Sequence, residues 1–172
     1  MDNMEFKDKL RHVARWIEKS NSDTNSFDKF ISLFIAFNMF YSLYALYKNP
    51  KAHLETGDGK KALATIELLN KIDFFDHNAE TLRNFSDKCQ QFIVEVNGKD
   101  VSDRLKAQID KEEKQKVTYL SLQMLYKIRC NLVHGEKEYH LSQGELLGAS
   151  SMLLRVYLGD LLSKFEEKLN NS

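Results

Sequence analysis

Residues that interrupt helices are scarce in this chain, and that scarcity limits the folds open to it. Pro50 is the only proline among 172 residues, and there are seven glycines. Folds made of short strands need such residues at most of their turns, whereas long helices need few of them. Apolar residues make up 42% of the chain, which is ordinary for a domain with one sizeable core. The sequence therefore predicts an all-α, single-domain helical bundle over residues 1–172.

Apolar residues recur at helical spacing through most of the chain, and polar or breaking residues divide it into five to seven helices. We expect helices over residues 4–20, 27–48, 60–72, 78–97, 116–134 and 143–170. Ser26 is expected to cap the second of these helices, and Asn49-Pro50 to end it. We expect a break at residues 73–77. The charge-rich residues 100–116 are expected to form a solvated helix face or an excursion from the bundle.

The balance of charge argues against a general affinity for nucleic acid. The chain has 25 basic and 25 acidic residues, so its formal net charge is zero. Any nucleic-acid contact must then come from a local site rather than from an overall basic field. The two cysteines, Cys89 and Cys130, lack the spacing of metal ligands, and no cluster of acidic, histidine and cysteine residues predicts a metal site. We expect no cofactor and no metal.

Residues 30–47 form an uncharged run of eighteen residues, which reaches the lower bound for a membrane span. The run includes Ser32, Asn38, Ser42 and three tyrosines, and charged residues flank it. We interpret it as a central core helix. The N-terminus lacks the charged and apolar regions of a signal peptide. We therefore expect a cytoplasmic protein that does not enter a membrane.

The helix expected over residues 116–134 is apolar on two opposite sides. Ile128 lies on one apolar stripe, and Tyr119, Leu122 and Tyr126 lie on the other. A helix of this kind is covered on both sides. It lies either at the centre of the bundle or between its own core and a partner subunit.

Three polar side chains near the end of this helix form a set that suits a phosphodiester. Residues 126–136 read Tyr-Lys-Ile-Arg-Cys-Asn-Leu-Val-His-Gly-Glu. Arg129 offers a cation, Asn131 an amide, and His134 an imidazole with a pKa near neutral pH. On an unbroken helix Arg129 and His134 are about 140° and about 7.5 Å apart, too far to hold one small group. They cooperate if the helix ends near His134, with Gly135 in the left-handed conformation, or if a two-fold dimer joins one chain's histidine to the other's arginine.

The same residues also have a purely structural interpretation. A histidine in a last helical turn interacts favourably with the helix dipole, and a glycine after it is an ordinary cap. An arginine in a bundle often pairs with a carboxylate. Spacing alone does not separate these two interpretations.

Two short segments resemble a known family. Ile-Arg-Cys-Asn-Leu-Val-His-Gly at 128–135 resembles the signature of the HEPN superfamily, Arg-x(4–6)-His at the end of a helix, and is most similar to its Apea-like branch. Ile-Ala-Phe-Asn-Met-Phe-Tyr at 35–41 resembles the family's second helix, where an aromatic-Asn-x-x-Tyr pattern faces the site. The segments are about ninety residues apart and in the expected order. The resemblance implies a HEPN-like helical bundle that dimerises around the motif helix.

Many members of this family are metal-independent endoribonucleases, and the resemblance implies the same activity here, as a toxin or defence effector. Arg129 would bind the phosphate, and His134 would act as general base or acid. The RNA 2′-hydroxyl would attack the adjacent phosphorus, which yields a 2′,3′-cyclic phosphate and a 5′-hydroxyl. Asn131 would orient the phosphate or the histidine.

Further residues are expected to bind the substrate. Asn38 and Tyr41 are the positions of the second-helix pattern that the resemblance assigns to the site. Lys127 and Lys137 flank the motif and are expected to attract phosphate. The expected partners are a second copy of the chain, bound through the 116–134 helix, RNA, and a protein antitoxin.

The chain departs from the family pattern in two places. Cys130 follows the arginine where many active members have Asn, Asp or His, and Glu136 stands where members modified by a nucleotidyltransferase often have tyrosine. Two alternatives stay open. One is a non-catalytic HEPN module that binds RNA, nucleotide or a partner protein. The other is an unrelated helical interaction protein, in which an internal carboxylate pairs with Arg129.

Overall fold

The all-α prediction is confirmed. The computed structural model describes residues 2–51, 53–92, 95–96, 99–133 and 143–171, and these ranges contain seven α-helices. The helices are α1 (Asn3–Ser22), α2 (Ser26–Lys48), α3 (Asp58–Ala64), α4 (Lys71–Phe92), α5 (Ser102–Asp110), α6 (Lys114–Val133) and α7 (Gly144–Asn170). A 3-10 turn, η1 (Thr65–Leu68), follows α3. Two antiparallel two-residue strands, β1 (Glu95–Val96) and β2 (Lys99–Asp100), precede α5.

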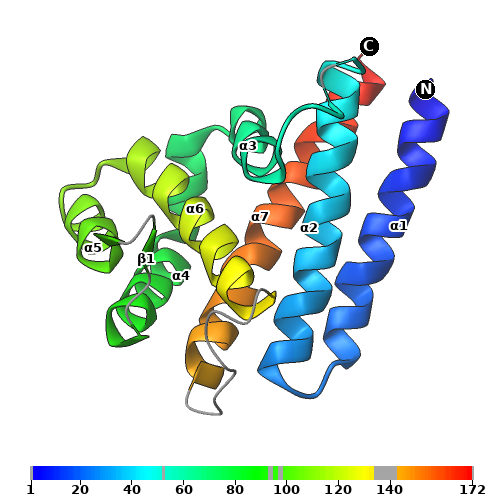
Figure 1. Ribbon diagram of the computed structural model, residues 1–172. Coiled ribbons are helices and arrows are strands. Elements are labelled where there is room, and N and C mark those ends of the chain that lie inside the picture. The colour runs from blue at the N-terminus through cyan, green and yellow to red at the C-terminus, as the bar shows by residue number, and fades with distance from the viewer. Residues whose placement is uncertain (1, 52, 93–94, 97–98, 134–142, 172) are drawn as a thin grey trace.

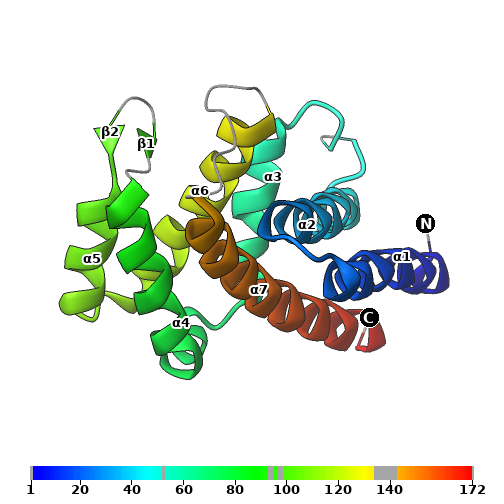
Figure 2. The same cartoon turned by 90° about the horizontal axis from the view of Figure 1, so that it is seen from below.

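The helices form two groups with α6 between them. Figure 1 shows α1, α2 and α7 side by side on one side of the molecule, and α4 and α5 on the other. Seen from below in Figure 2, the last turns of α6 lie beside α3. The two ends of the chain lie at the same end of the molecule (Figure 1).

Short polar side chains start the first two helices. Asp2 and Glu5 form a capping box at α1, in which each side chain accepts a hydrogen bond from the other residue's backbone. At α2 the Oδ1 atom of Asn25 accepts a hydrogen bond from the backbone N–H of Asp28 at 2.8 Å. The prediction that Ser26 caps α2 was therefore wrong by one residue. Asn25 has the extended backbone that a cap requires, whereas Ser26 is already helical.

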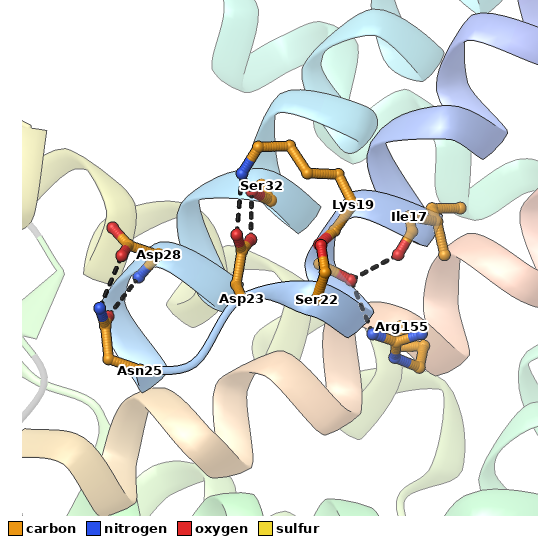
Figure 3. Close-up of polar contacts among 9 residues, drawn as sticks. Ile17, Lys19, Ser22, Asp23, Asn25, Asp28, Ser32 and Arg155 are labelled. Carbon is orange, nitrogen blue, oxygen red and sulfur yellow. Dashed lines mark hydrogen bonds and ion pairs between the residues drawn. The ribbon is translucent and has the colours of Figure 1, made fainter.

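A polar network fixes the turn between α1 and α2 (Figure 3). Asp23 accepts hydrogen bonds from Lys19 at 2.8 Å and from the hydroxyl of Ser32 at 2.6 Å. The guanidinium of Arg155 on α7 donates to the hydroxyl of Ser20 at 2.6 Å. The hydrogen bonds from Lys19 and Ser32 hold the pKa of Asp23 below its ordinary value. The angle between the first two helices, and their attachment to α7, thus depend on buried and half-buried polar groups.

An aromatic cluster joins α1, α2 and α7. The ring of Phe165 lies edge-on to Phe6, Phe40, Tyr44 and Tyr47, with centroid distances from 5.1 to 6.1 Å. Edge-to-face pairs of this kind add to the stabilisation from burial. They explain why α2 is apolar nearly all round, since α1 covers it on one side and α7 on another.

The sequence left open whether α6 lies at the centre of the bundle or between its own core and a partner subunit, and the structure shows both of its apolar sides partly covered within one chain. Leu122 and Ile128, from opposite apolar sides of α6, are both buried. The hydroxyl of the fully buried Tyr157 on α7 donates to the carbonyl oxygen of Thr118 at 2.6 Å and shares a second hydrogen bond with Ser121 at 2.8 Å. These bonds fix the register of α6 against α7.

Two predicted boundaries differ from the structure. The helix expected over residues 60–72 ends as the 3-10 turn at Leu68, and α4 begins at Lys71. The break expected at 73–77 was wrong, because Phe74 and Phe75 are buried and their packing keeps this segment helical. The helix instead kinks at Asn78, whose side-chain amide donates to the carbonyl oxygen of Phe74 at 2.8 Å.

The end of α4 differs from expectation, whereas the charge-rich segment after it agrees with one of the two expected alternatives, a helix with a solvated face. The helix expected over 78–97 ends at Phe92, and residues 95–96 pair with 99–100. Residues 102–110 form α5, so the charge-rich segment is largely helical. The end of α2 at Lys48, immediately before Asn49-Pro50, was predicted correctly.

Two helices in the described part of the chain, α2 and α7, are long and apolar enough to cross a membrane by length and composition. In each, 56% of the most apolar stretch is buried inside the bundle. A core helix of a water-soluble protein has the same properties, so this observation is weak evidence for a membrane. The cytoplasmic location stays a prediction.

Candidate functional site

Arg129 lies in the last turns of α6, half-buried, with its guanidinium over an aromatic ring of α2. Its Cζ atom is 5.7 Å from the ring centroid of Phe34, which is only 2% exposed. A cation–π contact of this kind contributes about 0.5–2 kcal/mol, depending on how far water is excluded. The ring therefore helps to position the guanidinium.

The Phe34 ring is itself held in place by other aromatic side chains. Phe30 and Phe37 lie one turn before and after it on α2, at centroid distances of 5.9 and 5.7 Å. Tyr126 on α6 lies 6.0 Å away and completes the contact between the two helices. The cation thus rests on a platform whose position is set by the core.

No carboxylate among the described residues forms an ion pair with Arg129. Asp58, at the start of α3, is the acidic residue whose charge raises the pKa values of the neighbouring tyrosines. Its carboxylate pairs with Lys61 at 3.5 Å. Within the described residues, the structure therefore does not have the internal ion pair that the purely structural interpretation of Arg129 expects.

Two tyrosine hydroxyls lie near this cation. Burial raises the pKa of the Tyr41 hydroxyl well above its ordinary value, and the negative charge of Asp58 raises it further, while Arg129 acts in the opposite direction. Burial likewise raises the pKa of Tyr126, with Cys130 and Asp58 as further causes. Both phenols are therefore neutral at physiological pH. They can donate and accept hydrogen bonds but are poor general bases.

Asn38 lies between Phe34 and Tyr41 on one face of α2. The three residues are one helical turn apart in sequence, at positions 34, 38 and 41, and so share a side of the helix. Asn38 is half-buried and Tyr41 is buried. The structure thus brings the α2 segment and Arg129, about ninety residues apart in sequence, to the same place.

Asn131 lies on a different face of α6 from Arg129. The two residues are two positions apart on a continuous helix, so their side chains leave it about 160° apart. The Oδ1 atom of Asn131 is shielded from solvent and has no hydrogen-bond partner among the described residues. Lys127, one turn before it, is half-buried. The structure places Asn131 with Lys127 rather than with Arg129.

The description of α6 ends at Val133, one residue before the motif histidine. His134 and Lys137 lie outside the described residues, so their predicted roles stay predictions. Within the described part of the chain, no three His, Cys, Asp or Glu side chains lie close enough together to hold a metal ion.

Two contributors to this site were missed in the sequence. Phe34 counted only as one of many apolar residues of α2, and Tyr126 only as part of the second apolar side of α6. The one sequence feature that could have identified Phe34 as part of the site is its position one helical turn before Asn38. Its pairing with Arg129 depends on the register between α2 and α6, which sequence spacing does not give. Cys130, which stands where the family pattern has a polar residue, is half-buried and close enough to Tyr126 to help raise the pKa of its hydroxyl.

A cavity elsewhere in the molecule lies between α1 and α2. It has a volume of about 280 Å³ and is lined by residues that include His12, Ser42 and His53. Ser42 is one turn after Asn38 on α2, so the cavity borders the face that carries Asn38. Phe34, Tyr41 and Arg129 are not among the residues that line it.

Comparison of the chain with protein-family models, with curated proteins and with solved structures gave no match.

Proposed function

We propose that this chain is a HEPN-type endoribonuclease that cleaves RNA without a metal ion. The observation that carries the proposal is the state of Arg129. Its guanidinium rests on the Phe34 ring, beside the α2 face that carries Asn38 and Tyr41, and no described carboxylate pairs with it. A half-buried cation that is held in place and has no carboxylate partner among the described residues is suited to an external anion.

The role of Arg129 follows from the shape of its side chain. A guanidinium presents its N–H groups in one plane, and a phosphate oxygen pair accepts two of them in parallel. The contact with the Phe34 ring, at 5.7 Å from Cζ to the ring centroid, supplies no oxygen that accepts these N–H groups. Arg129 would bind the scissile phosphate and stabilise the charge that grows on it in the transition state.

The proton transfers fall to His134 in this proposal. The phenols of Tyr41 and Tyr126 titrate too high for this role, whereas an imidazole titrates near neutral pH. The histidine takes the proton of the 2′-hydroxyl as the O2′–P bond forms. The P–O5′ bond breaks, and the departing 5′-oxygen takes a proton from water or from a protonated histidine. The products are a 2′,3′-cyclic phosphate and a 5′-hydroxyl, and no electron acceptor or metal is required.

Asn38, Tyr41 and Asn131 would support the phosphate or the histidine through hydrogen bonds, and Lys127 and Lys137 would attract the RNA backbone. Because Arg129 and His134 would lie about 140° apart on an unbroken helix, we propose that two chains form a homodimer around α6 and join their sites. A cytoplasmic toxin or defence effector, held inactive by a protein antitoxin, is the biological role that fits such an activity.

A non-catalytic module is the second candidate, and one observation favours it. Cys130 occupies the position next to the arginine and is engaged with Tyr126, so it does not supply the polar group that many active family members have there. Such a module would still bind RNA through Arg129 but would leave it intact.

The test is RNA cleavage by the purified protein in EDTA, with analysis of the product ends. Wild type is expected to leave 2′,3′-cyclic phosphate and 5′-hydroxyl ends, and His134→Ala and Arg129→Ala to reduce the rate by about a hundredfold or more, without loss of helical structure by circular dichroism. Arg11→Ala, which removes an exposed arginine of α1, is the matched control and should cleave at the wild-type rate. Wild-type protein that binds RNA but leaves diverse RNAs intact would favour the non-catalytic module. His134→Ala protein that cleaves at the wild-type rate would contradict the assigned role of that residue.

A further inference from the structure

A second pocket with basic and aromatic lining lies at the other end of α6, where α4, α5 and α6 meet. It has a volume of about 290 Å³ and is lined by Lys71, Arg104, Gln115, Lys116, Tyr119 and Leu120. Three of these six residues are cations and none is acidic. In a chain with zero net charge, this is a local concentration of positive charge.

Not every cation of the charge-rich residues 100–116 pairs with an acidic side chain of the described chain. Lys106 pairs with Asp87 at 3.2 Å, and Lys114 with Asp76 at 2.7 Å. Arg104, by contrast, has no ion pair with any described residue. The alternating charges of this segment therefore do not all neutralise one another.

Lys71 and Lys116 supply the rest of the charge in this pocket. Lys71 has no ion pair among the described residues, and Lys116 pairs with Glu113 at 3.2 Å in a contact exposed to water. An exposed pair of this kind is weak and exchanges readily for another anion.

Tyr119 adds an aromatic surface to the charge. Its side chain is 44% exposed, which makes it one of few large apolar residues on the described surface. A tyrosine ring beside several cations has the composition of a site for a nucleotide, because a base stacks on the ring while its phosphate binds the cations. A purely acidic partner would not require the exposed tyrosine ring, and a purely apolar partner would not require the three cations.

The pocket lies along the same helix as Arg129. Tyr119 and Arg129 are ten residues apart on α6, which corresponds to about 15 Å, or the rise of about four stacked nucleotides. Tyr119 and Tyr126 lie on nearly the same face, since seven residues are close to two turns. Gln123, one turn after Tyr119, is half-buried, so this side of α6 is not fully covered between the pocket and the site.

We propose that this pocket is a second contact for single-stranded RNA, in which Tyr119 stacks on a base and Lys71, Arg104 and Lys116 bind phosphate. This inference rests on the proposed ribonuclease function, since the RNA would be the strand that is cut near Arg129. The distance between the pocket and Arg129 sets how many nucleotides the RNA needs beyond the scissile bond. An RNA bound at Arg129 that is too short to reach the pocket lacks the second contact.

The test is fluorescence anisotropy with a labelled, unstructured RNA of twelve nucleotides, in EDTA and in the His134→Ala background, so that the RNA stays intact. Tyr119→Leu is expected to raise Kd by about tenfold, while Tyr119→Phe, which keeps the ring, stays close to the Tyr119 protein. Arg104→Gln is expected to reduce the dependence of log Kd on log salt by about 0.7. Lys164→Gln removes an exposed lysine of α7 and is the charge-matched control.

Three outcomes would overturn this proposal. The first is equal Kd values for the leucine and phenylalanine variants. The second is an Arg104→Gln effect no larger than that of Lys164→Gln, and the third is competition by free adenosine monophosphate as strong as by the RNA. The last outcome would identify a mononucleotide site instead.

Failure of the pocket and failure of the nuclease are distinguishable. Protein that cleaves RNA but binds it without regard to the ring at position 119 would keep the nuclease and reject the pocket. Ring-dependent binding without any cleavage by the unmutated protein would keep the pocket and reject the nuclease.

Discussion

At the scale of single residues, the arrangement of Arg129 decides how the molecule is interpreted. Its guanidinium is supported by an aromatic ring instead of an acidic side chain from the described part of the protein. An ion pair would neutralise the cation, whereas the Phe34 ring holds it and leaves its charge in place. The same cation therefore remains able to bind phosphate.

Phe34 should accordingly affect activity as well as stability. Phe34→Leu keeps an apolar side chain but removes the ring, so we expect kcat/KM for RNA cleavage to fall by about three- to thirtyfold. Phe30→Leu is the matched control, because Phe30 is also a buried aromatic residue of α2 but contacts Phe34 rather than Arg129. Both variants should lose stability in urea unfolding. Equal activity of the two variants would show that the ring does not position the guanidinium.

At the scale of elements, polar contacts between helices set the frame in which the site residues meet. The Tyr157 hydroxyl joins α7 to α6. Tyr157→Phe should lower the free energy of unfolding by about 1 kcal/mol, since the buried groups of Thr118 and Ser121 lose a partner. Tyr119→Phe, which removes an exposed hydroxyl, should change it little. Urea denaturation of both variants measures the difference, and equal effects would contradict the assigned role of Tyr157.

The turn between α1 and α2 gives the fold a pH dependence. The pKa of Asp23 is held below its ordinary value by Lys19 and Ser32, so its contribution to stability is present above the ordinary pKa and is lost as pH falls through the folded-state value. Asp23→Asn should therefore be less stable than wild type at pH 7. Thermal unfolding should show this difference shrinking below about pH 4. A difference that is constant across the acid range would contradict the network in Figure 3.

The helices of this fold were largely predictable from the sequence, because scarce breakers and helical periodicity are local signals. The end of α2 before Asn49-Pro50 shows this well. The kink at Asn78 was missed in favour of a full break, because burial of Phe74 and Phe75 outweighs the polar residues around them. Tertiary packing of this kind leaves no local mark in the sequence.

The candidate site was predictable only in part. Arg129, Asn38 and Tyr41 could be selected from two short segments, and the structure places these segments together. Phe34 and the pocket around Tyr119 could not be selected, since both depend on which helices lie side by side. The charges of residues 100–116 alternate along the sequence. In the fold, however, Lys106 and Lys114 pair with acidic residues of α4, whereas Arg104 and Lys116 line the pocket.

At the scale of the whole molecule, the proposed mechanism requires two chains. The two apolar sides of α6 are largely covered within one chain, which leaves the exposed stripe near Tyr119 and the end of the helix for any partner. A two-fold dimer that joins the ends of two α6 helices would place Arg129 of one chain near His134 of the other. Each dimer would then hold two composite sites.

Mixing of two inactive variants tests this account most directly. Arg129→Ala and His134→Ala proteins are unfolded and refolded together in equal amounts, and RNA cleavage is measured in EDTA. Each variant alone should be inactive. The mixture should recover about a quarter of the wild-type rate, because half of the dimers are mixed and each of these holds one complete site of two. Cleavage at the wild-type rate by either variant alone, or a mixture as inactive as its components, would contradict a site shared by these two residues across two chains.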